Sequence, residues 1–486
     1  MKPRRTRLAG AWSMAVIAGI AVSPRLGLWW LKSPVWLLVG VVCAVLAYLM
    51  RARLPYVFII CAGLIFGLNR GSAQAYDSYV INRYVGKVVS LEGTVSGDLE
   101  TDSKDQVVVK LTSLKIGDTT YRGDARITLS YAAQIKRSSR VVFEGKLTAG
   151  FGTYVATMYR PRVVSVVQDT DTARDVRDRF ADGVVRAIGK EPAGLGLGFL
   201  TGQKTYLTRE AENNLRLIGL SHIIVASGYN LTILVEFMRS KLKRWSRFVA
   251  LGGSCAAISG FMLVTGLSPS MVRAGIVASI SLAAWYYGRK LNPFVLVLLS
   301  AAVSALIKPS YIWGDLGWYL SFLSFFGVLL VGPLITQYFF SDKVAPNRVR
   351  SLVIETSSAQ VMTLPLTIAV FGAYSPLALI ANMAVLPLIP LTMAMVFIAG
   401  IGGIVFPQFL AQAMGYPAYI LIEYIVRVSR WFANSPYATS ELHFGNGTML
   451  ILYAFLGIFI CYMYQATHSS SIFNWTWLRR PAILKK

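Results

Sequence analysis

Residues 318–340 read WYLSFLSFFGVLLVGPLITQYFF and contain no charged side chain. A helix of this length and apolarity can cross the hydrocarbon core of a bilayer, which takes about 20 residues. Further apolar blocks lie at 8–22, 35–50, 55–68, 223–238, 248–265, 274–288, 294–307, 353–371, 377–405 and 449–464. The sequence therefore predicts a mainly α-helical protein, a polytopic transmembrane helical bundle.

The composition agrees with a membrane protein. Of the 486 residues, 55% are hydrophobic and 15% are charged, whereas soluble domains carry about 25% charged residues. The block at 8–22 lacks a small-residue cleavage site followed by a polar segment, so we expect a retained anchor and not a signal peptide. An ordinary soluble enzyme is excluded.

The basic residues indicate the orientation. Lys and Arg number 48 against 23 Asp and Glu, and they gather at 2–7, 51–53, 239–247, 289–290, 343–350 and 479–486. Under the positive-inside rule these segments are cytoplasmic. We therefore expect a cytoplasmic N-terminus and an extracytoplasmic segment at 84–191, and the net charge of +25 is mostly a topology signal.

A different pattern occupies residues 84–168. Short β-type runs at 87–95, 107–111, 125–129, 141–147 and 154–158 are separated by turns that contain Gly or Asp. Five such strands predict a small inserted β-barrel, OB-like in type. Barrels of this kind often stack the bases of a single strand on aromatic side chains beside a basic groove. Candidate external contacts are Tyr121, Arg122, Arg126 and Arg137; alternatively these residues are ordinary strand residues on a solvated surface.

Polar side chains interrupt the later apolar blocks. The run GLSHIIVASGYN at 219–230 contains His222, Ser227 and Asn230. Irregular backbone at membrane depth is tolerated where it is buried in protein or lines water. A cavity-lining role is one interpretation; the other is a buried His and Asn satisfied by neighbouring carbonyl groups.

A second polar element combines two distant segments. Arg273, in GLSPSMVRA at 266–274, would cost a few kcal/mol if it faced lipid. Asp315, in YIWGDLGWYLSF at 311–322, is the sole carboxylate of its predicted external stretch. We expect an Arg273–Asp315 pair near the outer membrane face. Carboxylates are otherwise scarce after Leu217, which argues against an ion-coupled transporter.

The ordered set of motifs resembles the ComEC-type competence protein family. It comprises 219–222 with 226–228, then 269–274, 315–322, Ala359-Gln360 with Leu364-Pro365, and Ser375-Pro376 with Asn382 and Pro387. The resemblance implies an inner-membrane channel that takes up single-stranded transforming DNA during natural competence. Two positions depart from the family pattern, which usually has His at Asn230 and Gln at Tyr319.

The resemblance also implies a domain order. We expect N-terminal transmembrane helices at 1–83, the extracytoplasmic barrel at 84–168 and a polar linker helix at 169–190. A competence-type channel domain with amphipathic or re-entrant segments follows at 191–470, then a basic cytoplasmic tail at 471–486. The metallo-β-lactamase-like nuclease domain of many family members is not expected here, because about 20 residues follow the last span.

Neither a metal nor a nucleotide motif is present. The histidines are His222, His443 and His468, which form no metal box, and no GxxxxGK[ST] sequence occurs. We expect no cofactor, no bound metal and no catalytic residue. The expected partners are single-stranded DNA, membrane lipid, an external DNA-receptor protein and a cytoplasmic helicase-like ATPase. A separate nuclease and a homo-oligomer remain open.

A polyanion needs a wet path with cations or hydrogen-bond donors across the hydrocarbon. The residues expected to line that path or to form the structural core of the channel are His222, Ser227, Asn230, Arg273, Asp315, Gln360 and Asn382. Arg273 is the expected phosphate contact. The alternatives are a permease or flippase for a smaller anionic substrate and a membrane scaffold that transports nothing.

Overall fold

The structure is a computed structural model that describes residues 5–50, 54–102, 106–131, 135–224, 228–289, 292–340 and 348–467. Ser227 and the expected tail at 471–486 lie outside these residues. The chain divides into two compact units. Unit 1 comprises Met1–Val176, Met262–Ile280 and Leu298–Tyr319, and unit 2 comprises Arg177–Phe261, Ser281–Val297 and Leu320–Lys486. The boundaries pass through helices α4, α9, α10, α11 and α13.

The predicted fold class is confirmed. Among the described residues, eight helical stretches are long and apolar enough to cross a membrane. They are α1 (Arg5–Leu26), α3 (Leu54–Asn82), α9 (Arg247–Val264), α13 to α14 (Leu316–Phe326 and Gly332–Phe339), α15 (Arg348–Phe371), α16 to α17 (Ala378–Val385 and Ile389–Val405), α18 (Gln408–Ala433) and α19 (Asn446–Thr467). Two shorter apolar helices are α2 (Val35–Leu49) and α11 (Pro293–Ile307). Helices α8 (Gly228–Leu242) and α10 (Pro269–Tyr286) overlap the apolar blocks predicted at 223–238 and 274–288.

Small residues bring α1 and α3 of unit 1 together. Gly63, Gly67 and Gly71 follow one another at intervals of four, so they lie on one face of α3. A Cβ atom on Gly67 would lie 2.3 Å from the carbonyl oxygen of Val16. Glycines spaced in this way allow helix backbones in a membrane to approach closely. The pairing of α1 with α3 therefore depends on backbone contact.

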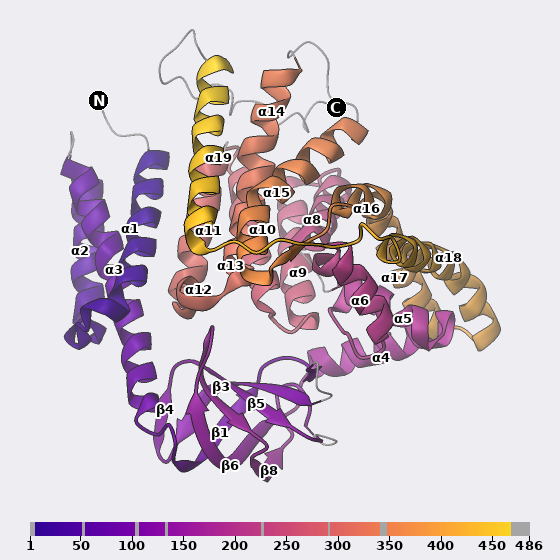
Figure 1. The fold of residues 1–486 in the computed structure, drawn as a ribbon, viewed down its shortest axis with the longest axis horizontal. Helices are drawn as coiled ribbons and strands as arrows, with labels where there is room; N and C mark the ends of the chain where they lie inside the picture. The colour runs from indigo at the N-terminus through magenta and orange to yellow at the C-terminus, as the bar shows by residue number, and fades with distance from the viewer. Residues whose placement is uncertain are drawn as a thin grey trace. The chain divides into compact units, whose positions relative to one another are not determined.

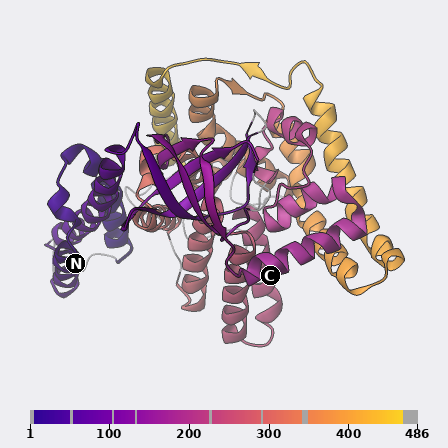
Figure 2. The same ribbon diagram turned by 90° about the horizontal axis from the view of Figure 1, so that it is seen from below.

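The inserted domain is a closed β-barrel (Figures 1 and 2). Its barrel strands are β1 (Val88–Val95), β3 (Val107–Ile116), β5 (Asp124–Leu129), β6 (Arg140–Ala149) and β7 (Tyr154–Tyr159). They pair in the order β1-β3-β5-β7-β6, with β6 returning to β1. The pair β5–β7 is parallel and the others are antiparallel. Short strands β2 (Glu100–Thr101), β4 (Thr119–Tyr121) and β8 (Arg162–Val167) attach to this barrel.

Every second side chain along the barrel strands points inward, and these side chains fill the barrel interior. Leu91, Leu111, Ile127, Phe143 and Met158 come from five different strands and are fully buried. Because side chains point to opposite faces in turn along a strand, the intervening residues face outward. All five strands lie where the sequence predicted them, and the closed five-stranded arrangement is consistent with an OB-like fold.

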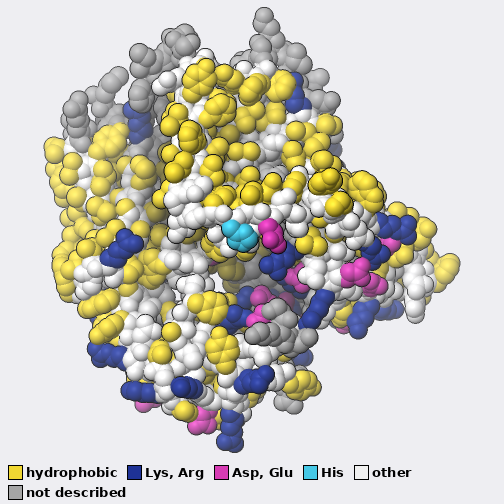
Figure 3. Space-filling view, viewed as in Figure 1, with side chains coloured by type: hydrophobic (Ala, Val, Ile, Leu, Met, Phe, Trp, Pro, Cys, Tyr) yellow, Lys and Arg dark blue, Asp and Glu magenta, His cyan; other side chains and the backbone are white. Residues whose placement is uncertain are grey.

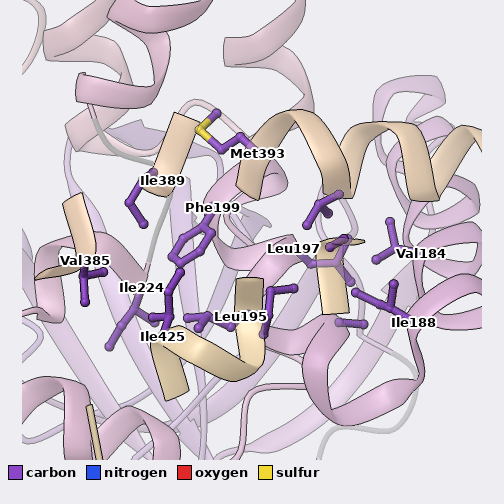
Figure 4. Close-up of a cluster of buried hydrophobic side chains, with 14 of the residues drawn as sticks. Val184, Ile188, Leu195, Leu197, Phe199, Ile224, Val385, Ile389, Met393 and Ile425 are labelled. Atoms are coloured by element: carbon purple, nitrogen blue, oxygen red, sulfur yellow. The ribbon is translucent and has the colours of Figure 1, made fainter. Parts of the chain in front are cut away.

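Unit 2 has its own apolar core. Side chains from α4 (Thr172–Ile188), α5 (Lys190–Thr201), α6 (Arg209–Leu217), α7 (Ser221–Ile224) and α16 to α18 bury one another. Figure 4 shows Phe199, Leu195, Ile224 and Val385 among them, pointing toward one another. Helices α4 and α17 touch through backbone, since a Cβ atom on Gly403 would lie 1.9 Å from the carbonyl oxygen of Gly183. The side chain of Thr208 accepts from the backbone N–H of Ala211 and caps α6.

Two spans of this unit are irregular. Between α13 and α14 the chain forms a π-helical turn, Gly327–Val331, that packs on α15. Residues 378–405 form one broken helix. The break is a 3-10 turn at Leu386–Leu388 that contains Pro387.

The outer surfaces of the helices are apolar. On the face drawn in Figure 3, hydrophobic side chains cover the helices, while charged side chains lie mainly over the barrel and around α4 to α6. Many large hydrophobic residues of the candidate spans are exposed, among them Phe409 in α18 and Phe455 in α19. Soluble monomers rarely expose contiguous apolar surface on this scale. The chain is therefore a multi-pass membrane protein.

Candidate functional site

The pair expected from the sequence is present in unit 1. A guanidinium nitrogen of Arg273, in the second turn of α10, donates to Asp315 Oδ2 at 3.5 Å. Another donates to the carbonyl oxygen of Gly317 at 3.1 Å. The Arg273 side chain is 4% exposed and that of Asp315 is 18% exposed. These contacts join the start of α10 to the start of α13.

A second ion pair lies beside the first. Lys308, after α11, pairs with Asp124 at the start of barrel strand β5. The ring of Tyr311 in α12 (Ser310–Gly314) lies 5.4 Å from Lys308 Nζ and 6.0 Å from the Arg273 guanidinium carbon. We call Asp124, Arg273, Lys308, Tyr311 and Asp315 the junction cluster. It links the barrel to the helix ends within unit 1.

Backbone contact strengthens this link. A Cβ atom on Gly314, the last residue of α12, would lie 2.6 Å from the carbonyl oxygen of Gly152 in the β6–β7 loop. Beside this contact is a cavity of about 190 Å³, lined by Gln74, Ser78, Asn82, residues 149–150 and 152–155, Ser310 and Trp313. Helix α3, the β6–β7 loop and α12 therefore meet around a polar hollow.

The four candidate external contacts have different environments. Arg122 is exposed. Arg126 faces outward from β5 and its guanidinium donates to Asp102 Oδ2 at 2.8 Å. Tyr121 is 8% exposed and packs into the barrel core, because it is the inward-facing residue of β4. Its ring therefore cannot serve as an exposed stacking platform in this structure.

Arg137 has a structural position. Its guanidinium donates to both carboxylate oxygens of Asp171, at 2.9 and 3.2 Å, and to the carbonyl oxygen of Val264 at 3.3 Å. Arg137 is 7% exposed, so the structure does not present it to an external strand. The sequence did not indicate this position because its partners lie 34 and 127 residues further along the chain.

Asp171 is the centre of that contact. It also accepts from Ser138 Oγ at 2.7 Å and from the backbone N–H of Arg174 at 2.9 Å. Burial opposes ionisation of the carboxyl group, but the hydrogen bonds from Arg137, Ser138 and Arg174 outweigh it and hold the pKa of Asp171 well below its usual value. Asp171 therefore fastens the segment after the barrel to residues 137–138.

The remaining candidates lie in unit 2. Asn230, 2% exposed, donates from Nδ2 to the carbonyl oxygen of Phe199 at 2.9 Å and so ties α8 to α5. Asn382 in α16 is 6% exposed, and within the described part of the chain its Oδ1 has no hydrogen-bond partner. His222 in α7 is exposed, and Gln360 in α15 is half-buried. Asn230 and Asn382 are thus core residues, while His222 and Gln360 remain accessible.

The structure adds residues that the sequence analysis did not select. Lys308 and Asp124 form the second ion pair of the junction cluster, and Tyr311 lies between its cations. A signal for Lys308 existed, since it is one of few basic residues in the predicted external loops. Among the described residues, no group of three or more His, Cys, Asp or Glu side chains is placed to hold a metal ion.

Comparison with known proteins identifies the family. Residues 199–467, more than half of the chain, match the family described as Competence protein. The chain belongs to the competence protein family. This family region begins in α5 and includes α6 to α19, whereas the barrel and α1 to α3 lie before it.

A curated relative of this competence-family chain is ComE operon protein 3 of Bacillus subtilis (strain 168). The two are 22% identical over 202 residues, which cover 40% of this chain and 25% of the relative. The chain thus matches about a quarter of that relative's length. No solved structure matches the chain.

Proposed function

We propose that this competence-family protein is a channel in the cell membrane that passes single-stranded DNA into the cytoplasm during natural transformation. One observation carries the proposal. A closed barrel of OB-like topology contacts the ends of membrane helices through the junction cluster and the Gly152–Gly314 approach, all within unit 1. Such barrels are frequent binders of single strands, so this arrangement offers a strand-binding fold at the membrane helices.

The orientation follows from the distribution of charge. With the basic segments in the cytoplasm, the N-terminus is cytoplasmic and the barrel is extracytoplasmic. An entering strand then meets the barrel before the hydrocarbon region, and the basic segment 239–247 faces the side of release. The proposed domain order is the one predicted from the sequence.

The candidate residues divide into two roles. His222, Gln360 and Ser227 are proposed to line the wet path, since the first two are accessible side chains on otherwise apolar elements. Within unit 2, Asn230 and Asn382 are proposed to hold the helices that carry these side chains; within unit 1, Arg273 and Asp315 are proposed to hold the helix ends beside the barrel, because all four are buried or nearly so. In this proposal Arg273 stabilises the helix ends at the entrance and does not bind DNA itself, because its guanidinium donates to Asp315 and Gly317 of the same chain.

Transport by this route needs partners. We propose that the chain itself is not an enzyme and uses no cofactor. A cytoplasmic helicase-like ATPase supplies the work, an external receptor delivers DNA, and a separate nuclease removes the second strand. The proposal does not require that several copies assemble into a homo-oligomer.

One observation favours a second candidate, a membrane scaffold that transports nothing. Arg273 and Asn230, two of the residues selected for a DNA path, bind groups of their own chain. In a scaffold these contacts would only join helices. A permease or flippase for a smaller anion would need a compact anionic site and would leave the barrel without a role.

The test is uptake of marked DNA in a strain that lacks the gene, complemented by wild type or by His222→Ala. DNA bound outside the cell and recombinants are scored separately, with membrane levels of each variant measured. Loss of recombinants on deletion, with external DNA still bound, supports a channel. Uptake that continues after deletion would refute the proposal, and a His222→Ala strain with normal uptake would remove His222 from the path.

A further inference from the structure

The barrel has an outward face where two basic residues lie side by side. Lys110 in β3 and Arg126 in β5 are directly opposite each other in the antiparallel register. Both side chains face outward, between buried neighbours such as Val109 and Ile127. These strands are the second and third of the five barrel strands, the face that OB folds commonly use for oligonucleotides.

An exposed aromatic ring extends this face. Phe151, 48% exposed in the β6–β7 loop, has its ring 5.3 Å from the Arg126 guanidinium carbon. Cations beside an exposed aromatic ring are the elements from which single-strand sites are built.

Both cations are occupied by carboxylates of the same chain. Glu100 Oε1 accepts from Lys110 Nζ at 2.6 Å, and Asp102 Oδ2 accepts from Arg126 at 2.8 Å. Glu100 and Asp102 are two residues apart in the β1–β3 connection, so they project to the same side. We call residues 100–102 the acidic arm.

The arm is held in place by backbone as well as by charge. Strand β2 pairs with β3, with Glu100 opposite Val108 and Thr101 opposite Val107. The backbone N–H of Asp102 donates to the carbonyl oxygen of Gln106 at 2.8 Å. The arm is therefore part of the sheet, and its carboxylates are presented to Lys110 and Arg126 in a fixed register.

We propose that Glu100 and Asp102 occupy the phosphate positions of this face, so that a DNA strand binds the barrel by exchanging its phosphates for the two carboxylates. This inference rests on the proposed function and adds a regulation of its external site. The arm lowers the affinity of the barrel for DNA, which favours transfer of the strand onward over retention outside.

The exposure of the ion pairs suits such an exchange. The side chains of Glu100 and Asp102 are 52% and 38% exposed, and those of Lys110 and Arg126 are 33% and 22% exposed. Ion pairs at this level of exposure contribute little to stability and are screened by salt. A polyanion can therefore displace the carboxylates without unfolding the barrel, while the backbone of the arm stays paired.

The test compares Glu100→Gln/Asp102→Asn with wild type, using the full chain in lipid nanodiscs. The probe is a fluorescein-labelled dT20 strand, and anisotropy gives its Kd at a fixed low salt concentration. Two freed cations should tighten binding by about 2- to 30-fold, given the usual strength of exposed pairs. Adding Lys110→Gln/Arg126→Gln to the arm variant should abolish that gain.

A matched control removes the same charge elsewhere on the barrel. Asp118 and Glu144 are exposed and lie on the β3–β4 turn and on β6, away from the Lys110–Arg126 row. Asp118→Asn/Glu144→Gln should leave the Kd within about twofold of wild type. An equal gain in this control would show a general charge effect and overturn the inference, as would an arm variant that binds no more tightly than wild type.

The uptake assay separates this inference from the proposed function. If deletion of the gene abolishes DNA uptake while the arm variant leaves the Kd unchanged, the arm proposal falls and the channel stands. If uptake is unaffected by deletion, the channel proposal falls. A tighter Kd in the arm variant would then show that the barrel binds DNA and that the arm weakens this binding, without a role in transport.

Discussion

A guanidinium nitrogen of Arg273 lies 3.5 Å from Asp315 Oδ2, across 42 residues of chain, and a second donates to the carbonyl oxygen of Gly317. Both side chains are largely buried. Removing one partner of a buried pair leaves an uncompensated charge and costs about 3–5 kcal/mol, whereas neutralising both is often tolerated. The pair therefore allows a structural role to be separated from a role in DNA transfer.

We predict that Arg273→Gln and Asp315→Asn each lower the thermal stability of the detergent-solubilised chain, and that the double variant recovers at least half of the loss. DNA uptake should recover with it, because we propose that the pair holds the helices at the entrance and makes no contact with phosphate. Melting temperature, membrane level and recombinant frequency are measured for all four proteins. A stable double variant that fails in uptake would instead assign Arg273 a direct contact with DNA.

The second prediction concerns Asp171, which accepts hydrogen bonds from Arg137, Ser138 and Arg174. Asp171→Asn should destabilise the chain by about 2 kcal/mol, because buried donors to a charged group lose their acceptor. Asp169 is the matched control: it is 54% exposed and forms a 3.7 Å pair with exposed Arg140. Asp169→Asn should change stability by less than about 0.5 kcal/mol.

The effect of Asp171 should depend on pH in a defined direction. Its folded-state pKa lies below the unfolded value, which is about 3.9. Between these two values the unfolded state binds more protons, so the stabilisation is complete above about pH 5 and is lost as the pH falls further. The melting-temperature difference between wild type and Asp171→Asn should be constant from pH 8 to 5 and shrink near pH 3.5. A difference that grows on acidification would contradict this account.

The third prediction tests the backbone contact between the barrel and α12. Gly314→Ala would place a methyl group 2.6 Å from the carbonyl oxygen of Gly152, so one of the two backbones must move. We expect a loss of about 1–3 kcal/mol, typical of overpacking, together with reduced DNA uptake. Gly260→Ala is the control, since nothing lies within 4 Å of its added Cβ atom. Equal melting temperatures for both variants would show that the contact is not tight.

Local patterns predicted much of this fold. The β-type run at 141–147 placed Phe143 and Leu147 inside a strand, and the structure has both on β6. The Arg273–Asp315 contact was predictable because a buried cation in an apolar helix needs a partner and few carboxylates were available.

Long-range closure could not be predicted in this way. Strand periodicity alone did not show that Tyr121 points into the barrel, since β4 has three residues and pairs only with the end of β3. The sequence predicted Arg137 as a basic residue on the barrel surface. Its partners Asp171 and Val264 are distant in the sequence and lie beside it only in the folded chain. The same holds for Lys308 and Asp124, which are 184 residues apart.

The last prediction concerns the proposed wet path. His222→Cys, in a chain whose native cysteines are replaced by Ser, should react with a membrane-impermeant thiosulfonate, because its exposed side chain is proposed to line the wet path. Single-stranded DNA should slow this reaction if the strand passes α7. Cys255 is the control: it is exposed on the candidate span α9 and should face lipid, where a thiol stays protonated and unreactive. A chain that retains only Cys255 should therefore react far more slowly than the His222→Cys chain. Equal rates at the two positions, or a rate at His222→Cys that DNA leaves unchanged, would place the DNA path elsewhere in the helical bundle.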